Sequence, residues 1–185
     1  GVLVPQQVCL STLKPQFYQP GKVGLITTSE HLSYEVAAEL NKADIGQSIV
    51  VSIGEDRIVG SDLPEWLAIL NDDPNTEAII SIGLSLNKAE EMATYCKLYG
   101  CDKPILAYVA GLKAPQEKIS GDAMSIITNR LSSSIPVVNR DRQKISRLKK
   151  AGIMVAKKPS EIPNLIEKSR VKSQKIIHIF IPRNI

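Results

Sequence analysis

The sequence predicts an α/β fold, a flavodoxin-like parallel sheet with helices on both faces. Short apolar runs of strand length alternate with longer segments in which apolar residues recur every three or four positions. Glycine, proline or a capping residue separates most of these segments. Strands that alternate with helices at this spacing form right-handed βαβ units, and such units build a parallel sheet that is covered on both faces.

The strands of this sheet are predicted from the apolar runs. They are expected at residues 22–27, 48–53, 77–82, 104–110 and 153–156, and a further short strand is expected at residues 2–4. The run at 105–110 is apolar throughout, which is typical of a parallel strand buried on both faces. Ligands of an open α/β sheet bind beyond the carboxyl ends of its strands, so the loops at these ends are where chemistry is expected.

The helices are predicted from the periodic segments and their end signals. They are expected at residues 29–45, from about 63 onward, 87–99, from 122 onward, 140–151, and from 159 to about 170. Thr28 or Ser29 is expected to cap the first helix and Asp122 the fourth, because their side-chain oxygens can accept from free backbone N–H groups. Gly46, Gly100 and Gly152 are expected to end helices.

The composition is that of a globular protein, with 43% hydrophobic and 23% charged residues among 185. No apolar run approaches the roughly 20 residues that cross a bilayer, and no signal pattern opens the chain. We therefore predict a cytoplasmic protein without membrane contact. Cys9, Cys96 and Cys101 are odd in number and lack the spacing of a metal site, so they are predicted to be reduced thiols.

The charge of the chain is unevenly distributed. Residues 140–185 carry 13 Lys and Arg against 3 Asp and Glu, whereas the rest carries 10 against 16. A basic region can bind an acidic partner or nucleic acid. Aromatic residues that would stack on bases are absent from the basic helix, which favours a solvated helix face over a nucleic-acid partner.

Three parts are predicted along the chain. Residues 1–20 contain three prolines and are predicted to be a linker or the end of a preceding domain, and residues 21–170 form the flavodoxin-like domain. Residues 171–185 are a C-terminal extension whose apolar run at 175–181 is predicted to be a strand. Because an exposed apolar strand invites edge pairing, this run is expected either to join its own sheet or to cross to a partner.

A series of short segments between residues 21 and 166 carries a family resemblance. The segments include PGKVGLI at 20–26, LSYE at 32–35, GQS at 46–48, DP followed by TE at 73–77, and AGLKAP at 110–115. In their order and spacing the chain resembles the α subunit of succinyl-CoA synthetase and related nucleoside-diphosphate-forming acyl-CoA ligases. The resemblance implies a succinyl-CoA-synthetase-like ligase domain.

The chain departs from the family pattern where the resemblance implies chemistry. The family phosphorylates a histidine in a GHAG segment, and this chain has Asp122 after Gly121 at that position. The family glutamate that orients the histidine corresponds to Leu84, which cannot accept a hydrogen bond through its side chain. Glu30 replaces the glycine of the phosphate-binding turn. A carboxylate about 4 Å from a bound anion costs about 4 kcal/mol at an effective dielectric of about 20, more than the 0.3–2 kcal/mol of a helix terminus.

No catalytic residue and no metal ligand are therefore assigned in the predicted site. The residues at the family's phosphate turn and histidine segment are the predicted ligand-binding residues, namely Thr28, Ser29, Glu30, Gly121 and Asp122. His31 lies next to this turn but is expected to be a surface residue of a first helical turn. His178 is expected to face solvent from the terminal strand.

Three functions are compatible with these residues. The first is a non-catalytic, degenerate ligase domain that acts in protein interaction or small-ligand binding. The second is a component of an NDP-forming acyl-CoA ligase whose CoA- and nucleotide-binding parts lie outside this chain. The third is a sensor that uses the strand ends near Glu30, Glu55, Leu84 and Asp122, whose three acids would favour a cation or an amine. No cofactor is expected in this chain, and CoA and nucleotide enter only with the second function. The expected partner is a β-subunit-like protein or a second copy of the chain.

Overall fold

The computed structural model describes residues 1–54, 60–109 and 140–169, which form a sheet covered by helices. The strands are β1 (Val2–Val4), β2 (Val8–Leu10), β3 (Pro20–Thr27), β4 (Gln47–Ser52), β5 (Ala78–Ile82), β6 (Ile105–Tyr108) and β7 (Met154–Ala156). The helices are α1 (Glu30–Lys42), α2 (Leu63–Asp72), α3 (Leu86–Tyr99) and α5 (Arg140–Lys150). Two 3-10 turns, η1 (Pro15–Phe17) and η2 (Pro159–Glu161), complete them, and a helix over 162–169 follows η2.

The order of the strands within the described residues is β2-β1-β4-β3-β5-β6-β7. From β4 to β7 every neighbouring pair is parallel, and β1 and β2 add an antiparallel hairpin beside β4. Numbered from β3, the parallel part has the order 2-1-3-4-5 of flavodoxin-like folds. The predicted fold class is confirmed.

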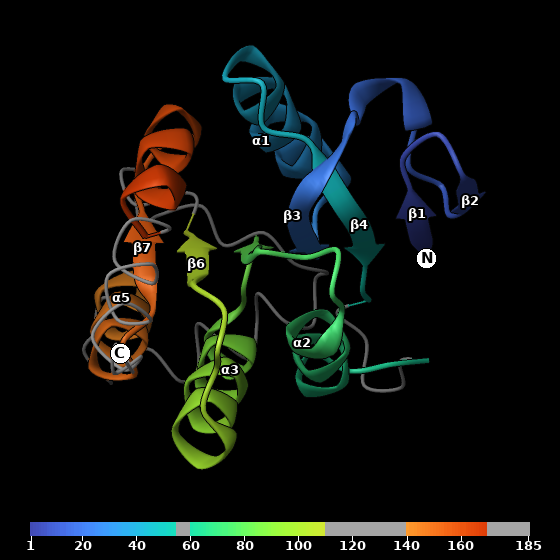
Figure 1. Cartoon of the computed structure of the whole chain (residues 1–185). Coiled ribbons are helices and arrows are strands. Elements are labelled where there is room, and N and C mark those ends of the chain that lie inside the picture. Colours follow the sequence, from blue (N-terminus) through green and yellow to red (C-terminus); the bar gives the residue numbers. More distant parts are fainter. Residues whose placement is uncertain (55–59, 110–139, 170–185) are drawn as a thin grey trace, which may run out of the picture.

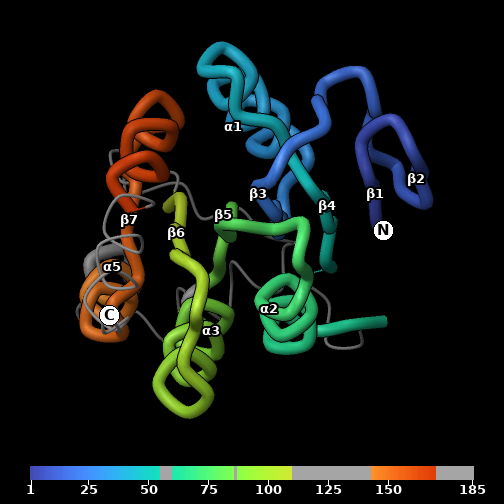
Figure 2. Tube along the Cα trace, viewed as in Figure 1, coloured from blue at the N-terminus to red at the C-terminus, as the bar shows by residue number. Residues whose placement is uncertain are grey.

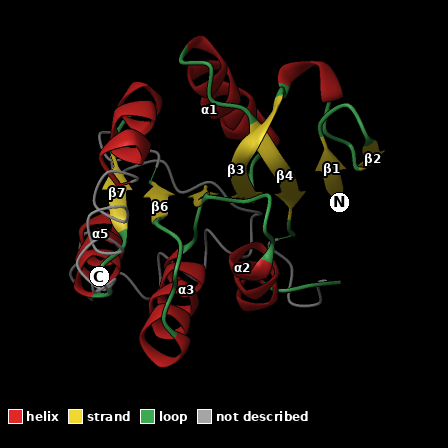
Figure 3. Cartoon of the chain, in the orientation of Figure 1, coloured by secondary structure: helices red, strands yellow, loops and turns green. Residues whose placement is uncertain are grey.

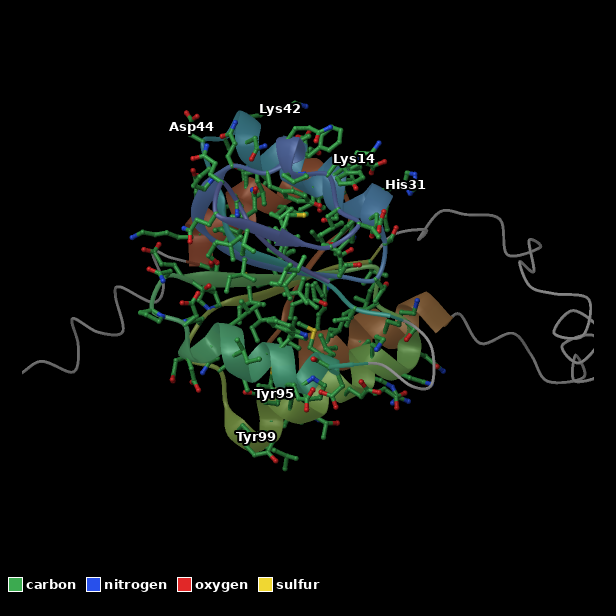
Figure 4. The ribbon with its side chains drawn as sticks, turned by 90° about the vertical axis from the view of Figure 1, so that its right-hand side faces the viewer. Lys14, His31, Lys42, Asp44, Tyr95 and Tyr99 are labelled. Carbon is green, nitrogen blue, oxygen red and sulfur yellow. The ribbon has the colours of Figure 1, made fainter. Side chains whose placement is uncertain are left out.

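Helices cover both faces of this sheet (Figures 1 and 3). One apolar core lies under α1 and the helix 162–169, and it includes Val36 and Ile166. The other core lies under α2, α3 and α5, and it includes Leu67, Met92 and Leu148. The view turned by 90° shows the same three layers, with the sheet between α1 and the α2–α3 pair (Figure 4). The central strands are buried on both sides, which explains their apolar runs.

Residues 1–20 pack onto the domain at the β4 edge of the sheet, where the chain begins (Figure 2). The short strand predicted at 2–4 is confirmed as β1, and its partner β2 was missed. Gln6 turns the chain between them with a φ of 61°. Tyr18 then bonds Ser33 of α1 across 2.8 Å. The division of the chain at residues 20 and 170 stays a prediction.

The observed helix ends confirm some of the predicted start and stop residues and contradict others. Asp62 caps α2 in a reciprocal capping box with Glu65, which fixes the start that the sequence predicts. Gly100 ends α3 with a φ of 73°, as expected of a C-terminal glycine. The prediction that α1 runs to residue 45 is wrong, because α1 ends at Lys42 and Asp44 adopts a φ of 54°. The predicted fourth helix and the strand at 175–181 lie outside the described residues.

The basic helix α5 packs as the sequence predicts. Leu148 is fully buried and Ile145 packs beside the same core, so they form its inner face. Arg147 is paired with Glu90 of α3, and Lys149 and Lys150 are exposed. Among the described residues, no helix is both long and apolar enough to cross a membrane.

Candidate functional site

The candidate site lies at the carboxyl ends of β3 and β5, the point where the strand order reverses. These strands run parallel and in register, so that Thr27 at the end of β3 pairs with Ile82 at the end of β5. The chain leaves β3 for α1 on one face of the sheet and leaves β5 for α3 on the other (Figure 1). The two connections therefore diverge, and a switch point of this kind is where open α/β sheets bind ligands.

The turn after β3 is held rigidly by its own threonines. Thr27 is fully buried, and its hydroxyl accepts from the Ser29 N–H at 3.0 Å and donates to the Ser29 carbonyl at 2.7 Å. Thr28 donates its hydroxyl to the Gly83 carbonyl at 2.6 Å and its N–H to the Ile82 carbonyl at 3.2 Å. The turns that follow β3 and β5 are thus bonded to each other.

Gly83 has to be glycine for this arrangement. Its φ is 76°, and an added Cβ would lie 2.8 Å from the Thr28 hydroxyl oxygen. A side chain here would be strained by the backbone and would also push the two turns apart. The glycine that follows β5 is therefore explained by local geometry.

The N-terminus of α1 opens at this turn. Ser29 occupies the N-cap position, as predicted, but its side chain makes no capping hydrogen bond. The Ser33 N–H, at the end of the first turn, donates to the Ser29 carbonyl. The N–H groups of a first helical turn have no partner within the helix, and together with the helix dipole they favour an anion.

Glu30 is directed toward the N-terminal segment of the chain. Its carboxylate accepts a hydrogen bond from the Thr12 hydroxyl, and its side chain is half-buried. The sequence predicts a charge close to the phosphate turn that opposes an anion. The structure adds a partner for this charge on residues 1–20, which could not be inferred from the local sequence.

Leu84 lies in the core. It is 4% exposed and belongs to the cluster beneath α2 and α3, with Ile26 and Met92. Ser85 follows it and caps α3 by accepting from the Lys88 N–H at 3.3 Å. The position at which the family pattern has an acid therefore carries an apolar side chain with buried surroundings.

Several predicted residues are not brought to this turn by the described structure. His31 is exposed and points outward from α1 (Figure 4), in agreement with its expected surface role. Gly121, Asp122, Glu55 and His178 lie outside the described residues. Among the residues that the structure does describe, no group of three or more His, Cys, Asp or Glu could hold a metal ion.

Tyr108 is a residue at the same sheet edge that the sequence did not single out. It ends β6, and its carbonyl accepts from the Gly83 N–H at 3.4 Å. Burial raises the pKa of its phenol, and the negative charge of Glu35 on α1 raises it further. A tyrosine at the end of an apolar strand resembles a core residue when only the sequence is read. No local signal could therefore have indicated that Tyr108 lies beside the turn.

Comparison with known proteins identifies the family. The family model described as the succinyl-CoA ligase-like flavodoxin domain matches residues 20–167, which include the turns that follow β3 and β5. The chain belongs to this family. The recognition made from the short segments is thereby confirmed.

The curated relatives of this ligase-like domain are named as subunits of CoA ligases, and several of them as α subunits. The subunit α 2 of an ADP-forming succinate–CoA ligase from Archaeoglobus fulgidus is 36% identical over 90% of this chain and 55% of its own length. The corresponding α subunit from Aquifex aeolicus is 34% identical over 91% of this chain and 53% of its own. A malate–CoA ligase α subunit from Methylorubrum extorquens is 38% identical over 69% and 43%. The chain spans about half the length of the curated relatives that it matches most broadly.

Solved structures show the same fold at lower sequence identity. ATP citrate lyase from Methanothrix soehngenii, solved in complex with citrate and coenzyme A, aligns with a TM-score of 0.63 at 19% identity. The alignment covers 90% of this chain and 26% of that one. The ATP citrate lyase of Methanosaeta concilii gives a TM-score of 0.62 over the same fractions. These likenesses support the fold of the ligase-like domain.

Proposed function

We propose that this chain is the ligase-domain component of an NDP-forming acid–CoA ligase and that it works with a β-subunit-like partner. The observation that carries the proposal is the open N-terminus of α1 at the β3–β5 switch point. The relatives that match almost the whole chain are named as α subunits of ADP-forming ligases, which supports the same reading. CoA and nucleotide would be bound by parts of the assembly outside this chain.

The chemistry of the turn fits a phosphoryl group. The first-turn N–H groups of α1 and the Ser29 hydroxyl can donate to phosphoryl oxygens, and the helix dipole favours their charge. The Thr28–Gly83 bond holds the turn in place before a ligand arrives. Donors that are positioned in advance do not need to reorganise when a charged group is transferred.

Glu30 does not need to prevent this binding. Its carboxylate is hydrogen-bonded to Thr12 in the described structure, and that bond orients it toward residues 1–20. The repulsion expected from the sequence assumed a carboxylate about 4 Å from the phosphoryl group, and it falls with distance and solvent screening.

A second candidate function is a non-catalytic binding domain, the reading that the sequence alone favoured. Leu84 is the observation that favours it, since an apolar side chain in the core cannot orient a phosphorylated group by hydrogen bonding. Asp122, at the family's histidine position, could accept a phosphoryl group only as an acyl phosphate, which is a different species from phosphohistidine.

The test uses the full-length protein purified with its partners from its native cells. The complex is incubated with γ-labelled ATP or GTP, CoA and a series of carboxylic acids, and both acyl-CoA and protein-bound label are measured. The ligase proposal predicts acyl-CoA formation. If label is retained on this chain, hydroxylamine should release it from an aspartyl phosphate and Asp122→Asn should abolish it. His31→Gln is the matched control and should leave the label unchanged.

The outcomes separate the two candidates. Acyl-CoA without label on this chain would retain the ligase role and place phosphoryl transfer on another subunit. Neither acyl-CoA nor label, together with a stoichiometric co-purifying protein, would overturn the ligase proposal and support the binding domain.

A further inference from the structure

Two of the three cysteines lie beside each other at the end of α3. Cys96 is in the last turn of this helix, and Cys101 follows Gly100, whose left-handed backbone reverses the chain. The Gly100 N–H donates to the Cys96 carbonyl at 3.2 Å, which holds the reversal in place. The two sulfur atoms are 3.2 Å apart in a thiol–thiol hydrogen bond.

The surroundings of the two thiols are partly apolar and still accessible. Both side chains are half-buried and pack against the core under α2 and α3, together with Trp66 and Tyr95. Burial, and to a smaller extent the hydrogen bond with Cys101, together raise the pKa of Cys96 to about 12. Burial also raises the pKa of Cys101, the hydrogen bond with Cys96 lowers it, and the negative charge of Asp102 raises it.

We propose that Cys96 and Cys101 form a dithiol site that closes reversibly to an intramolecular disulfide by exchange with a small-molecule or protein disulfide. The Cys101 thiolate attacks one sulfur of the oxidant and expels a thiolate, which leaves a mixed disulfide on Cys101. Cys96 then gives up its proton, attacks the Cys101 sulfur and expels the second thiolate. Two electrons pass to the oxidant, which leaves as two thiols, and one sulfur–sulfur bond forms within the chain.

The geometry requires little movement for this closure. A disulfide bond is about 2.05 Å long, so the two sulfurs have to approach by only about 1.2 Å. The residues between them include Gly100, which tolerates changes in φ and ψ that other residues resist. The proposal does not depend on the ligase role of the domain.

Closure of the disulfide would restrict the exposed residues that lie between the two cysteines at the end of α3. Leu98 and Tyr99 lie between the two cysteines and are 71% and 76% exposed. The rings of Tyr99 and Tyr95 pack in a tilted arrangement with centroids 5.2 Å apart, and Figure 4 shows the two residues close together. A disulfide would therefore restrict the position of exposed apolar side chains that border a surface hollow between α2 and α3.

The first experiment reads the disulfide directly from peptides. The full chain is equilibrated with oxidised and reduced glutathione, remaining thiols are alkylated, and trypsin is added. Trypsin cleaves after Lys88, Lys97 and Lys113 but not before Pro104, so Cys96 and Cys101 fall on separate peptides, residues 89–97 and 98–113. A disulfide holds these two peptides together, and reduction separates them.

The exposed Cys9 serves as an internal control. It has no thiol partner beside it, so glutathione should modify it only by forming a mixed disulfide. A neighbouring thiol has an effective concentration in the millimolar range or above. With about 0.1 mM glutathione, the linked peptides should therefore exceed the glutathionylated forms of Cys96 and Cys101 by about tenfold or more. Cys101→Ser should abolish the linked product and leave Cys9 glutathionylation unchanged.

A second measurement does not depend on oxidation. Phenylarsine oxide bridges two close thiols, so wild-type protein should bind one equivalent that an added dithiol removes, and Cys101→Ser should bind none tightly. Cys9→Ser should still bind one equivalent. The proposal is refuted if Cys96 and Cys101 are alkylated separately at every glutathione ratio, or if the arsenical fails to bind folded wild-type protein.

Discussion

Replacement of Tyr18 by phenylalanine tests whether residues 1–20 fold together with the ligase-like domain. The Tyr18 and Ser33 hydroxyls are 2.8 Å apart, and the two residues are 4% and 0% exposed. Tyr18→Phe leaves the Ser33 hydroxyl buried without this partner, which costs about 1–3 kcal/mol of unfolding free energy. Ser33→Ala should cost a similar amount by leaving the phenol unpaired. The double variant should lose less than the sum, because both ends of the bond are then apolar.

The same pair predicts a dependence on pH. Burial raises the pKa of Tyr18 from 10.0 to about 12, so the folded state holds the phenolic proton more tightly than the unfolded state does. Stability from this group is fully present below about pH 10 and is lost as the pH rises from about 10 to about 12. At 1.36 kcal/mol per pKa unit, the wild type should lose about 2.7 kcal/mol across this interval relative to Tyr18→Phe.

The assay is urea denaturation followed by circular dichroism at about pH 8 and about pH 11. At the higher pH roughly half of the titration loss should be present, so the stability difference between wild type and Tyr18→Phe should narrow by about 1.4 kcal/mol. A difference below about 0.5 kcal/mol at both pH values would refute the reasoning. Residues 1–20 would then be a linker that contributes nothing to cooperative unfolding.

Three further variants test other parts of the structure. Gly46→Ala should lower the free energy of unfolding by more than about 3 kcal/mol, because the added Cβ would lie 2.0 Å from the Pro20 carbonyl oxygen. Gly60→Ala is the control in the same urea assay and should be neutral, because its added Cβ meets nothing within 4 Å. Lys103→Met should lower the free energy of unfolding by about 2–3 kcal/mol, because the Lys103 ammonium donates to the Leu70 and Asp73 carbonyls at 2.8 and 2.5 Å. Lys97→Met, at an exposed position, is the control. Leu84→Glu should lower the thermal midpoint at neutral pH and do so less in acid, because the new carboxylate replaces a side chain that is 4% exposed; an unchanged midpoint would contradict its burial.

The sequence alone determined the family and, apart from β2, the order of the described strands and helices. Apolar runs set the strands, since a strand buried on both faces favours apolar side chains at almost every position, as in β5, where Ser81 is the exception, and in β6. Local end signals set the helices, because Asp62 and Gly100 act within one turn of their own positions. The β2 strand was missed because its three residues are all exposed, so the sequence has no alternation of buried and exposed positions there.

Only the tertiary structure decided which side chains meet at the candidate site. Thr28 and Gly83 are 55 positions apart, and their bond exists because parallel pairing brings the ends of β3 and β5 to one edge. Glu30 and Thr12 likewise meet because residues 1–20 fold back beside α1. Contacts of this kind depend on strand order and on the path of the chain over the sheet, and the local periodicity that reveals helices and strands carries no information about either.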